Sequence, residues 1–168
     1  MSIPAGVTHI GAMAFSGCSG LTSVAIPASV RSIGKHPFCW SPRISKITVD
    51  GANHFYRAEN DALYNKAKTN LIYWPRGKKA VVEIPSSVTN IESWAFLQCD
   101  GFSSVTIPSG VMRIGEFAFC ACTELMSVTI CGERPTAPDK VFRDCSKLKS
   151  IHVPANAKSW AGMKEWQG

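Results

Sequence analysis

Hydrophobic residues recur along this chain with a period of 23 residues. We count each unit from an Ile or Val that usually precedes a proline, and call this residue position zero. The zero positions are Ile3, Ile26, Val49, Ile84, Ile107, Ile130 and Val153, spaced by 23 residues except for one gap of 35. A fixed period of about 20–50 residues is typical of solenoids and repeat arrays. We therefore predict a stack of similar coils.

Three further columns of side chains keep this period and predict the core. Position twelve is always phenylalanine: Phe15, Phe38, Phe96, Phe119 and Phe142. Position fifteen holds Cys18, Ser41, Cys99, Cys122 and Cys145, and position eighteen holds Leu21, Ile44, Phe102, Leu125 and Leu148. A single unit cannot bury these side chains, but stacked units share one core. We expect each column to form a continuous ladder through the molecule.

Within a unit, the pattern predicts two short strands and a turn. Segments such as "LTSVAI" (21–26) and "LMSVTI" (125–130) alternate apolar with small polar residues, which is typical of a half-buried strand. The proline that follows ends strand pairing and turns the chain. A second extended piece, Val-x-x-Ile, then leads into "AMAF", "SWAF" or "EFAF", for which we expect a helical turn or a tight bend.

The gap of 35 residues predicts an irregular coil. Within it, an alternating pattern at Leu63, Tyr64, Leu71 and Tyr73, together with the turn-like segment "YNKAKTN" (64–70), favours a β-hairpin whose inner face replaces a coil. We predict one domain over 1–168, with regular coils at 3–48 and 84–152, the hairpin-bearing coil at 49–83 and a C-terminal cap at 153–168. In the cap, Trp160 and Trp166 are expected to cover the last coil.

The unit I-P-x-x-V-x-x-I-x-x-x-A-F-x-x-C-x-x-L-x-x-V-x-I resembles the 23-residue leucine-rich repeat of BspA-type bacterial surface proteins. The resemblance covers nearly the whole chain, and it includes the long hairpin-bearing unit and the closing cap. It implies a strand-rich leucine-rich repeat solenoid. It also implies a cell-surface or secreted protein that adheres to host or neighbouring-cell proteins. The departures are Ser41 in the cysteine column and "ICGERPTAPDKVF", which lacks the regular Val and Ile.

Charge and hydropathy narrow the classes of partner. The net charge is +6, but its distribution is uneven. Residues 1–49 carry four basic residues and no acidic one, whereas residues 83–125 carry five acidic residues and a single basic one, Arg113. A nucleic-acid binder would present one continuous basic face, so we expect no nucleic-acid partner.

No apolar run approaches the length of a membrane-spanning helix, about 20 residues. A secretory signal is not visible, and because the chain begins within two residues of a repeat boundary we expect it to be trimmed from a longer protein.

The side chains able to carry chemistry fit structural roles better than catalytic ones. Four of the seven cysteines occupy the ladder position, where a thiol acts as a small apolar group. Cys120 and Cys122 form a C-x-C pair without the second pair that a zinc site requires. The four histidines occupy unrelated repeat positions and have no nucleophile or carboxylate at a recognisable spacing. We predict no catalytic residue, no metal and no cofactor.

Candidate binding residues concentrate in the irregular unit, because insertions in solenoids often form the binding face. Residues 54–79 combine aromatic and cationic side chains, a composition common at recognition sites. Trp74 and Trp94 are expected to be partly exposed, Trp94 because position ten varies between coils. The predicted ligand-binding set is Tyr56, Arg57, Trp74, Arg76, Lys78, Lys79 and Trp94.

Three function classes remain open at this point. The first is non-catalytic binding to a protein, such as host extracellular matrix. The second is a carbohydrate-binding module that uses exposed Trp and Tyr side chains. The third is a structural spacer within a larger surface protein. Salt should weaken binding through charge but leave stacking of a sugar on tryptophan almost unchanged.

Overall fold

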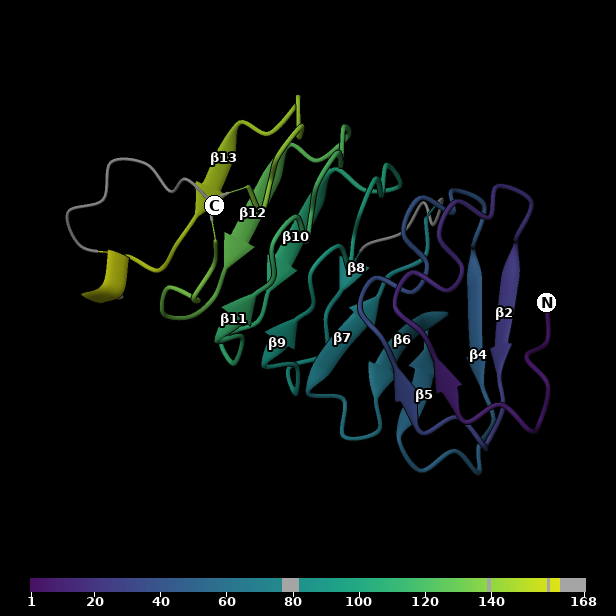
Figure 1. Cartoon of the computed structure of the whole chain (residues 1–168). Helices are drawn as coiled ribbons and strands as arrows, with labels where there is room; N and C mark the ends of the chain where they lie inside the picture. Colours follow the sequence, from purple (N-terminus) through teal and green to yellow (C-terminus); the bar gives the residue numbers. More distant parts are fainter. Residues whose placement is uncertain (77–81, 139, 157, 161–168) are drawn as a thin grey trace.

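The computed structural model of this chain describes residues 1–76, 82–138, 140–156 and 158–160. It is a strand-rich solenoid of stacked coils that runs from the N-terminus to the C-terminus (Figure 1). The first column of strands contains β2 (Ser23–Ile26), β4 (Lys46–Val49), β8 (Val82–Glu83), β10 (Ser104–Ile107), β12 (Ser127–Ile130) and β13 (Ser150–His152). The second contains β1 (His9–Ile10), β3 (Ser32–Ile33), β9 (Asn90–Ile91) and β11 (Arg113–Ile114). The predicted fold class is confirmed.

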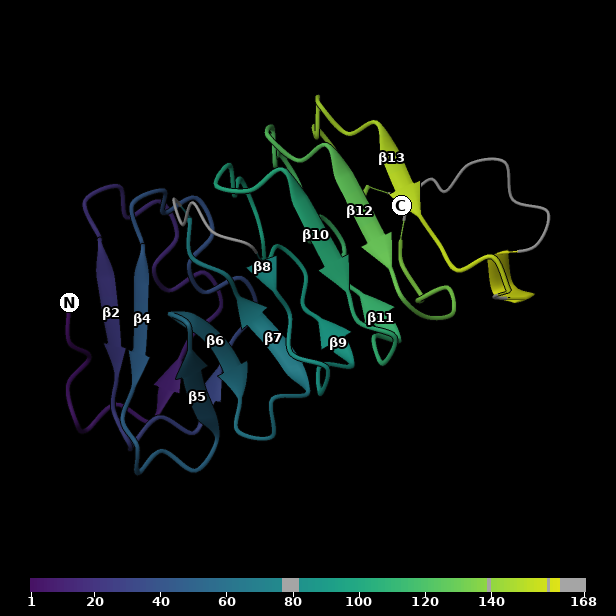
Figure 2. The ribbon, with the colours of Figure 1, turned by 180° about the vertical axis from the view of Figure 1, so that it is seen from behind.

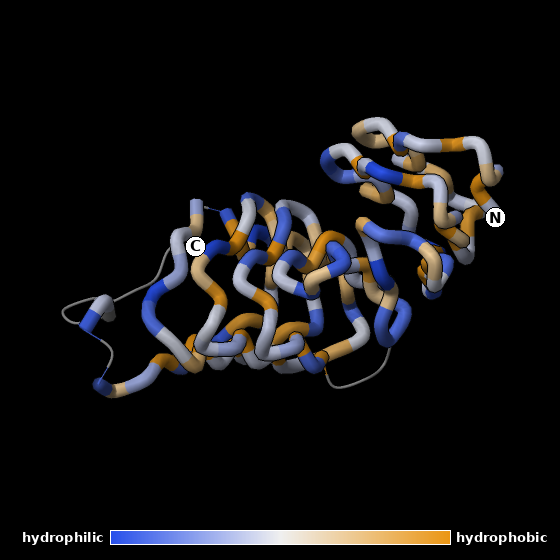
Figure 3. Tube along the Cα trace, turned by 90° about the horizontal axis from the view of Figure 1, so that it is seen from below, coloured by the Kyte–Doolittle hydropathy of each residue, from blue (hydrophilic) through white to orange (hydrophobic). Residues whose placement is uncertain are grey.

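The 23-residue period sets the register of the parallel strands. Ser104 lies opposite Ser127, and Ser23 lies opposite Lys46, so equivalent residues of successive coils pair directly. Within β10 the apolar Val105 is buried whereas Ser104 is exposed, as the alternation predicts. Hydrophobic stretches accordingly recur from coil to coil along the chain (Figure 3).

The irregular unit contributes three antiparallel strands, one more than the predicted hairpin. They are β5 (Tyr56–Glu59), β6 (Ala62–Asn65) and β7 (Asn70–Tyr73). β7 also pairs in parallel with β9, so the second column continues onto the insertion in the order β11-β9-β7-β6-β5. The first column is interrupted here, because β2-β4 and β8-β10-β12-β13 form separate sheets. Figure 2 shows the insertion lying between β4 and β9.

Strands β6 and β7 form a wall between two hydrophobic cores. Leu63 and Tyr73 face the N-terminal core, whereas Tyr64 and Leu71 face the C-terminal core. Because neighbouring residues of a strand point to opposite sides, a wall buried on both faces needs apolar residues at consecutive positions. Burial, with a smaller effect from the Glu59 carboxylate, raises the pKa of Tyr64 to about 12. The predicted hairpin is therefore buried on two faces instead of one.

Contacts between aromatic rings connect the coils and reach the insertion from both sides; the Phe38–Tyr73 pair meets edge to face, and the other pairs are stacked. The centroid distances are 5.7 Å for Phe15–Phe38, 5.1 Å for Phe38–Tyr73, 5.3 Å for Trp74–Phe96, 4.5 Å for Phe96–Phe119 and 5.3 Å for Phe119–Phe142. Trp74 takes the position of a ladder phenylalanine and is 3% exposed. The expectation that Trp74 is partly exposed is wrong, because its ring stacks on Phe96 inside the core.

The cysteine column forms a ladder of hydrogen bonds. The thiols of Cys122 and Cys145 donate to the carbonyls of Phe96 and Phe119, at 3.1 and 3.0 Å. Ser41 donates in the same way to the Phe15 carbonyl, so serine preserves the donor that the column requires. Burial is the main cause that raises the pKa of the Cys99 thiol, which keeps it protonated. All seven cysteines are free.

Asn53 fixes the entry into the insertion, and its side chain is fully buried. Its amide group donates to the carbonyls of Pro27 and Val30, at 2.9 and 3.0 Å. Its side-chain oxygen accepts from the backbone amides of Phe55 and Tyr56, both at 2.8 Å. These four bonds use the full hydrogen-bonding capacity of an asparagine side chain.

Replacing Asn53 with aspartate is expected to lower the free energy of unfolding by at least about 2 kcal/mol. The carboxylate cannot donate to the two carbonyls and brings a negative charge into a buried site. Urea unfolding followed by circular dichroism measures the loss. The same change at the exposed Asn156 serves as the control and should alter stability by less than about 0.5 kcal/mol. Equal stability of the two variants would contradict this role of Asn53.

At the C-terminal end, Lys158–Trp160 forms a short 3-10 helix. Residues 161–168, including Trp166, lie outside the described residues, as does the side chain of Trp160. The predicted packing of these tryptophans over the last coil, and the domain boundaries, stay predictions. Within the described ranges, no helix is long and apolar enough to span a membrane.

Candidate functional site

Two of the predicted binding residues lie on β5, at the outer strand of the insertion. The Tyr56 hydroxyl accepts a hydrogen bond from the Ile33 backbone amide at 2.9 Å, which connects β5 to the edge of β3. Tyr56 is half-buried, whereas Arg57 is exposed and forms an ion pair with Glu59 at 3.3 Å. Tyr56 therefore joins two sheets, and Arg57 stays on the surface.

The other predicted residues of the insertion connect it to the following coil. The Trp74 amide donates to the Ala95 carbonyl at 2.8 Å, and Arg76 Nε donates to the Gln98 carbonyl at 2.7 Å. These bonds align the irregular unit with the coil that begins at Ile84. Lys78 and Lys79 lie outside the described residues.

Trp94 is partly exposed, as predicted, and it stands in the middle of a row of aromatic rings. Its ring centroid lies 5.7 Å from that of His36, 5.8 Å from that of Trp40 and 4.9 Å from that of Phe117. We call His36, Trp40, Trp94 and Phe117 the aromatic ridge. Cys39, Leu97 and Cys120 form its buried floor.

The ridge is built on left-handed turns. Positions ten and fourteen of each regular coil have positive φ: Met13, His36, Trp94, Phe117 and Lys140 at position ten, and Gly17, Trp40, Gln98, Ala121 and Asp144 at position fourteen. Where the first coil has glycine, the second has Trp40, a residue with φ of 58° that is 50% exposed. The left-handed backbone costs a bulky residue roughly 1–2 kcal/mol relative to its preferred conformation. Trp40 thus presents a large apolar surface to solvent at a strained position.

The ridge crosses the insertion because the irregular unit has a shorter turn. Regular coils have four residues between positions seven and twelve, as in 92–95, whereas Leu71 and Trp74 are separated by two. The irregular unit therefore lacks the part of the turn that contains position ten in the regular coils. His36 reaches across this level, and its Nδ1 lies 3.3 Å from the Ser93 carbonyl oxygen.

Cationic side chains flank the C-terminal end of the ridge. Lys140 Nζ lies 5.7 Å from the centroid of the Phe117 ring, and the Arg143 guanidinium carbon lies 5.9 Å from it. A cation at this distance from an aromatic face is attracted by the negative face of the ring. The ridge therefore combines exposed aromatic surface with positive charge.

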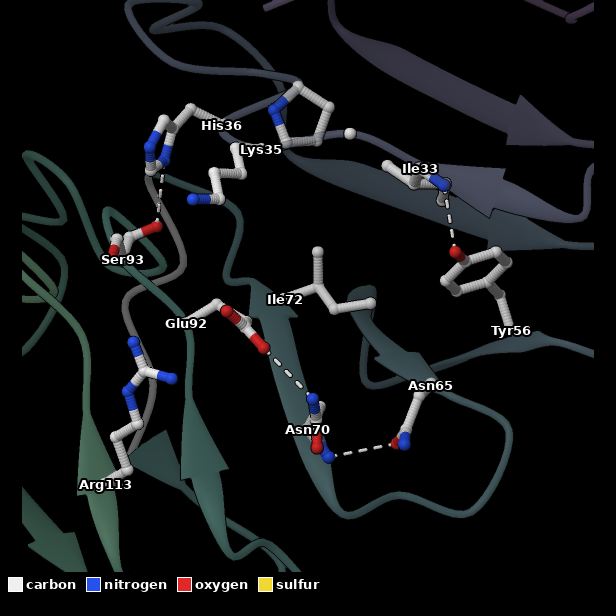
Figure 4. Close-up of a pocket in the computed structure, with 12 residues that line it drawn as sticks. Ile33, Lys35, His36, Tyr56, Asn65, Asn70, Ile72, Glu92, Ser93 and Arg113 are labelled. Atoms are coloured by element: carbon white, nitrogen blue, oxygen red, sulfur yellow. Dashed lines mark hydrogen bonds between the residues drawn. The ribbon is translucent and has the colours of Figure 1, made fainter. Parts of the chain in front are cut away.

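The missing turn also leaves a cleft of about 400 Å³ beside the ridge (Figure 4). It lies between β3 and the insertion, and Tyr56, Asn65 and Asn70 line one side of it. The other lining residues include Lys35, His36, Glu92, Ser93 and Arg113. The cleft is polar, in contrast to the apolar ridge.

The described ranges, which omit 77–81, 139, 157 and 161–168, contain no cluster of three or more potential metal ligands. In the ridge floor, burial is the main cause that raises the pKa of the Cys120 thiol. A thiol nucleophile requires a lowered pKa, so this environment suits packing better than reactivity.

Comparison with known protein families identifies the repeat. The family described as "BspA type Leucine rich repeat region" matches residues 1–80 and 78–161, with six copies. The chain belongs to the BspA-type leucine-rich repeat family. A comparison with curated protein sequences finds no significant match.

Solved structures with the same architecture include leucine-rich repeat proteins of three other bacteria. A leucine-rich cell surface protein from Faecalibacterium prausnitzii is 26% identical, with a TM-score of 0.70, over 94% of this chain and 54% of that one. A leucine-rich repeat protein from Eubacterium ventriosum is 26% identical, with a TM-score of 0.67, over 92% and 54%. One from Bacteroides ovatus is 28% identical, with a TM-score of 0.54, over 94% and 40%. This chain thus spans about half the length of the first two.

The sequence did not point to Trp40, Lys35 or Arg113 in this BspA-type protein. Trp40 lies at position fourteen, whose side chain differs in every coil, so periodicity gives no signal there. Lys35 and Arg113 come together only because the turn of the irregular unit is short. The two-residue spacing between Leu71 and Trp74 was the signal that could have shown this.

Proposed function

We propose that this chain is a non-catalytic protein-interaction module of a bacterial cell-surface or secreted protein, which adheres to proteins of a host or of neighbouring cells through the aromatic ridge. The observation that carries the proposal is Trp40, half-exposed on a left-handed turn. Both features cost free energy in the unbound protein, and burial against a partner would recover the apolar part. Exposed tryptophan and arginine are the side chains that most often dominate binding energy at protein interfaces.

Family membership supports this role, because BspA-type repeats are those of bacterial surface proteins and one solved relative is described as a cell surface protein. The geometry supports it as well. The ridge residues are held by backbone hydrogen bonds between coils, such as Trp94 to Glu116 at 3.2 Å. A preorganised surface loses less conformational entropy on binding.

The ridge, rather than the strand columns, is the continuous surface of the solenoid. The insertion separates β2-β4 from β8-β10-β12-β13, whereas His36, Trp94 and Phe117 remain in contact across it. Lys140 and Arg143 at one end of the ridge favour a partner with acidic residues beside an apolar patch. Arg57, exposed on β5, is a further candidate contact from the insertion.

Replacing Trp40 with alanine is expected to weaken binding to the protein partner at least tenfold without loss of stability. Truncating a central aromatic residue of an interface commonly costs about 2 kcal/mol or more of binding free energy. The measurement is surface plasmon resonance against immobilised extracellular matrix glycoproteins, at physiological and at high salt. The matched control is Met112→Ala, which removes another exposed apolar side chain, 66% exposed, away from the ridge.

Binding that weakens with salt and with Trp40→Ala, but not with Met112→Ala, would support adhesion through the ridge. Equal affinity of the Trp40→Ala variant and the unmodified chain would exclude the ridge as the binding surface. Absence of binding to every matrix protein and to intact neighbouring cells would favour a structural spacer and contradict the proposal.

A further inference from the structure

Two cationic side chains line the cleft beside the ridge. Lys35 and Arg113 line it from two different coils and are both exposed. Among the residues that the structure describes, neither side chain forms an ion pair or a hydrogen bond. Figure 4 shows both side chains at the cleft, with the Glu92 side chain between them. Two unpaired cations that converge on one hollow favour an anionic ligand.

Glu92 occupies a position where two other coils require glycine. Gly34 and Gly115 stand at position eight of their coils, and a Cβ added to either would lie 2.4 or 2.3 Å from the backbone of the preceding coil. The unit that precedes Glu92 is the irregular one, which lacks the turn whose backbone would clash with a Cβ. A glutamate therefore fits at residue 92. Its carboxylate points into the cleft and accepts a hydrogen bond from Asn70 Nδ2 at 3.0 Å. The cleft therefore offers a negative acceptor between two positive donors.

The remaining lining adds neutral donors and acceptors. The Tyr56 hydroxyl accepts from Ile33, and the same oxygen carries a proton that it can donate. His36 and the Ile33 and Ile72 side chains supply flat or apolar surface on the same walls. A hollow of about 400 Å³ also lies within the size range of small-ligand sites, roughly 300–1,000 Å³.

We propose that this cleft binds a sugar residue that carries a carboxylate, as part of a glycan. Lys35 and Arg113 would bind the carboxylate, and Glu92 would accept hydrogen bonds from ring hydroxyls. An acidic peptide offers carboxylates without neighbouring hydroxyl donors, so its side chains would leave Glu92 without a hydrogen-bond donor. A neutral sugar would leave both cations unpaired. Sialic acids and uronic acids share the required chemistry, and the experiment below distinguishes them.

The cleft shares His36 with the aromatic ridge, but Lys35 and Arg113, which carry the glycan proposal, are not part of the ridge. Trp40, which carries the adhesion proposal, does not line the cleft. Glycan binding can therefore fail while protein binding succeeds, and the reverse.

The experiment is isothermal titration calorimetry of the full chain with four probes. They are 3′-sialyllactose, a hyaluronan tetrasaccharide, lactose as the neutral counterpart and a tetraglutamate peptide. We expect one acidic saccharide to bind, with lactose and the peptide at least tenfold weaker. Lys35→Gln and Arg113→Gln should each weaken that binding about tenfold, since each removes a charge-assisted hydrogen bond.

Two controls separate the cleft from general effects of charge and from the ridge. Lys46→Gln removes an exposed charge on β4, outside the cleft, and should leave the affinity within twofold. Trp40→Ala should also leave it within twofold. Circular dichroism verifies that each variant is folded.

Three results would overturn the proposal. They are no binding of either acidic saccharide, binding of lactose with equal affinity, or unchanged affinity in the Lys35→Gln and Arg113→Gln variants. Preferential binding of tetraglutamate would instead assign the cleft to an acidic protein segment and reject the glycan.

Discussion

Replacing Trp74 with alanine is expected to lower the free energy of unfolding by about 3–5 kcal/mol. The indole is 3% exposed and stacks on Phe96 at 5.3 Å, so alanine leaves a large cavity where the insertion meets the C-terminal core. Trp74→Phe should lose much less, because phenylalanine is the normal ladder residue at this position. Urea unfolding followed by circular dichroism measures both losses.

The control for Trp74 is Trp40→Ala, since it removes the same side chain from a half-exposed site. We expect its free energy of unfolding to change by less than about 0.5 kcal/mol. If Trp74→Ala were as mild as Trp40→Ala, Trp74 would be a surface residue. That result would also contradict the description of the insertion as a wall between the two cores.

Replacing Phe119 with alanine is expected to cost about 3–5 kcal/mol as well. The ring is fully buried between Phe96 and Phe142, with centroids at 4.5 and 5.3 Å. Part of the loss is specific to stacking, because aromatic pairs contribute about 0.5–1.5 kcal/mol beyond the buried area. Phe119→Leu retains much of the volume but not the stacking, and should lie between alanine and the unmodified chain.

Phe55→Ala provides the matched control for Phe119, because Phe55 is 47% exposed on the insertion. Its unfolding midpoint in urea should differ little from that of the unmodified chain. A Phe119→Ala variant with an unchanged midpoint would mean that the coils do not share a continuous aromatic ladder.

The regular coils could be predicted from sequence because a 23-residue period fixes which residues meet. Val105 and Val128 pair in the sheet, and Phe96 and Phe119 stack, since each pair is separated by one repeat. Once the period was known, strand positions, register and ladders followed from it. The same logic explains Ser41, which keeps the hydrogen-bond donor of the cysteine column.

The irregular unit was predicted less well because its contacts do not follow the period. Trp74 precedes Pro75 in an insertion rich in charge, which favoured partial exposure of its side chain. Its actual place depends on a turn shortened to two residues between Leu71 and Trp74. Burial on both faces of β6 also requires knowledge of what lies on each side of that strand.

The candidate sites were the least predictable feature, because they arise from what the insertion lacks. His36 and Trp94 are 58 residues apart in sequence, and they meet because no position-ten turn separates them. Lys35 and Arg113 likewise line one cleft from coils on either side of the insertion. No spacing within a single repeat predicts these contacts.

Amide hydrogen exchange tests most directly the central claim, that the insertion is a wall buried between two cores. The account predicts that the amides of β6 and β7, which are hydrogen-bonded within the sheet, exchange as slowly as those of β10 and β12. Exchange of β6 and β7 at the rate of exposed loops, while β10 and β12 remain protected, would contradict it. The insertion would then be a surface loop rather than the wall that joins the two cores.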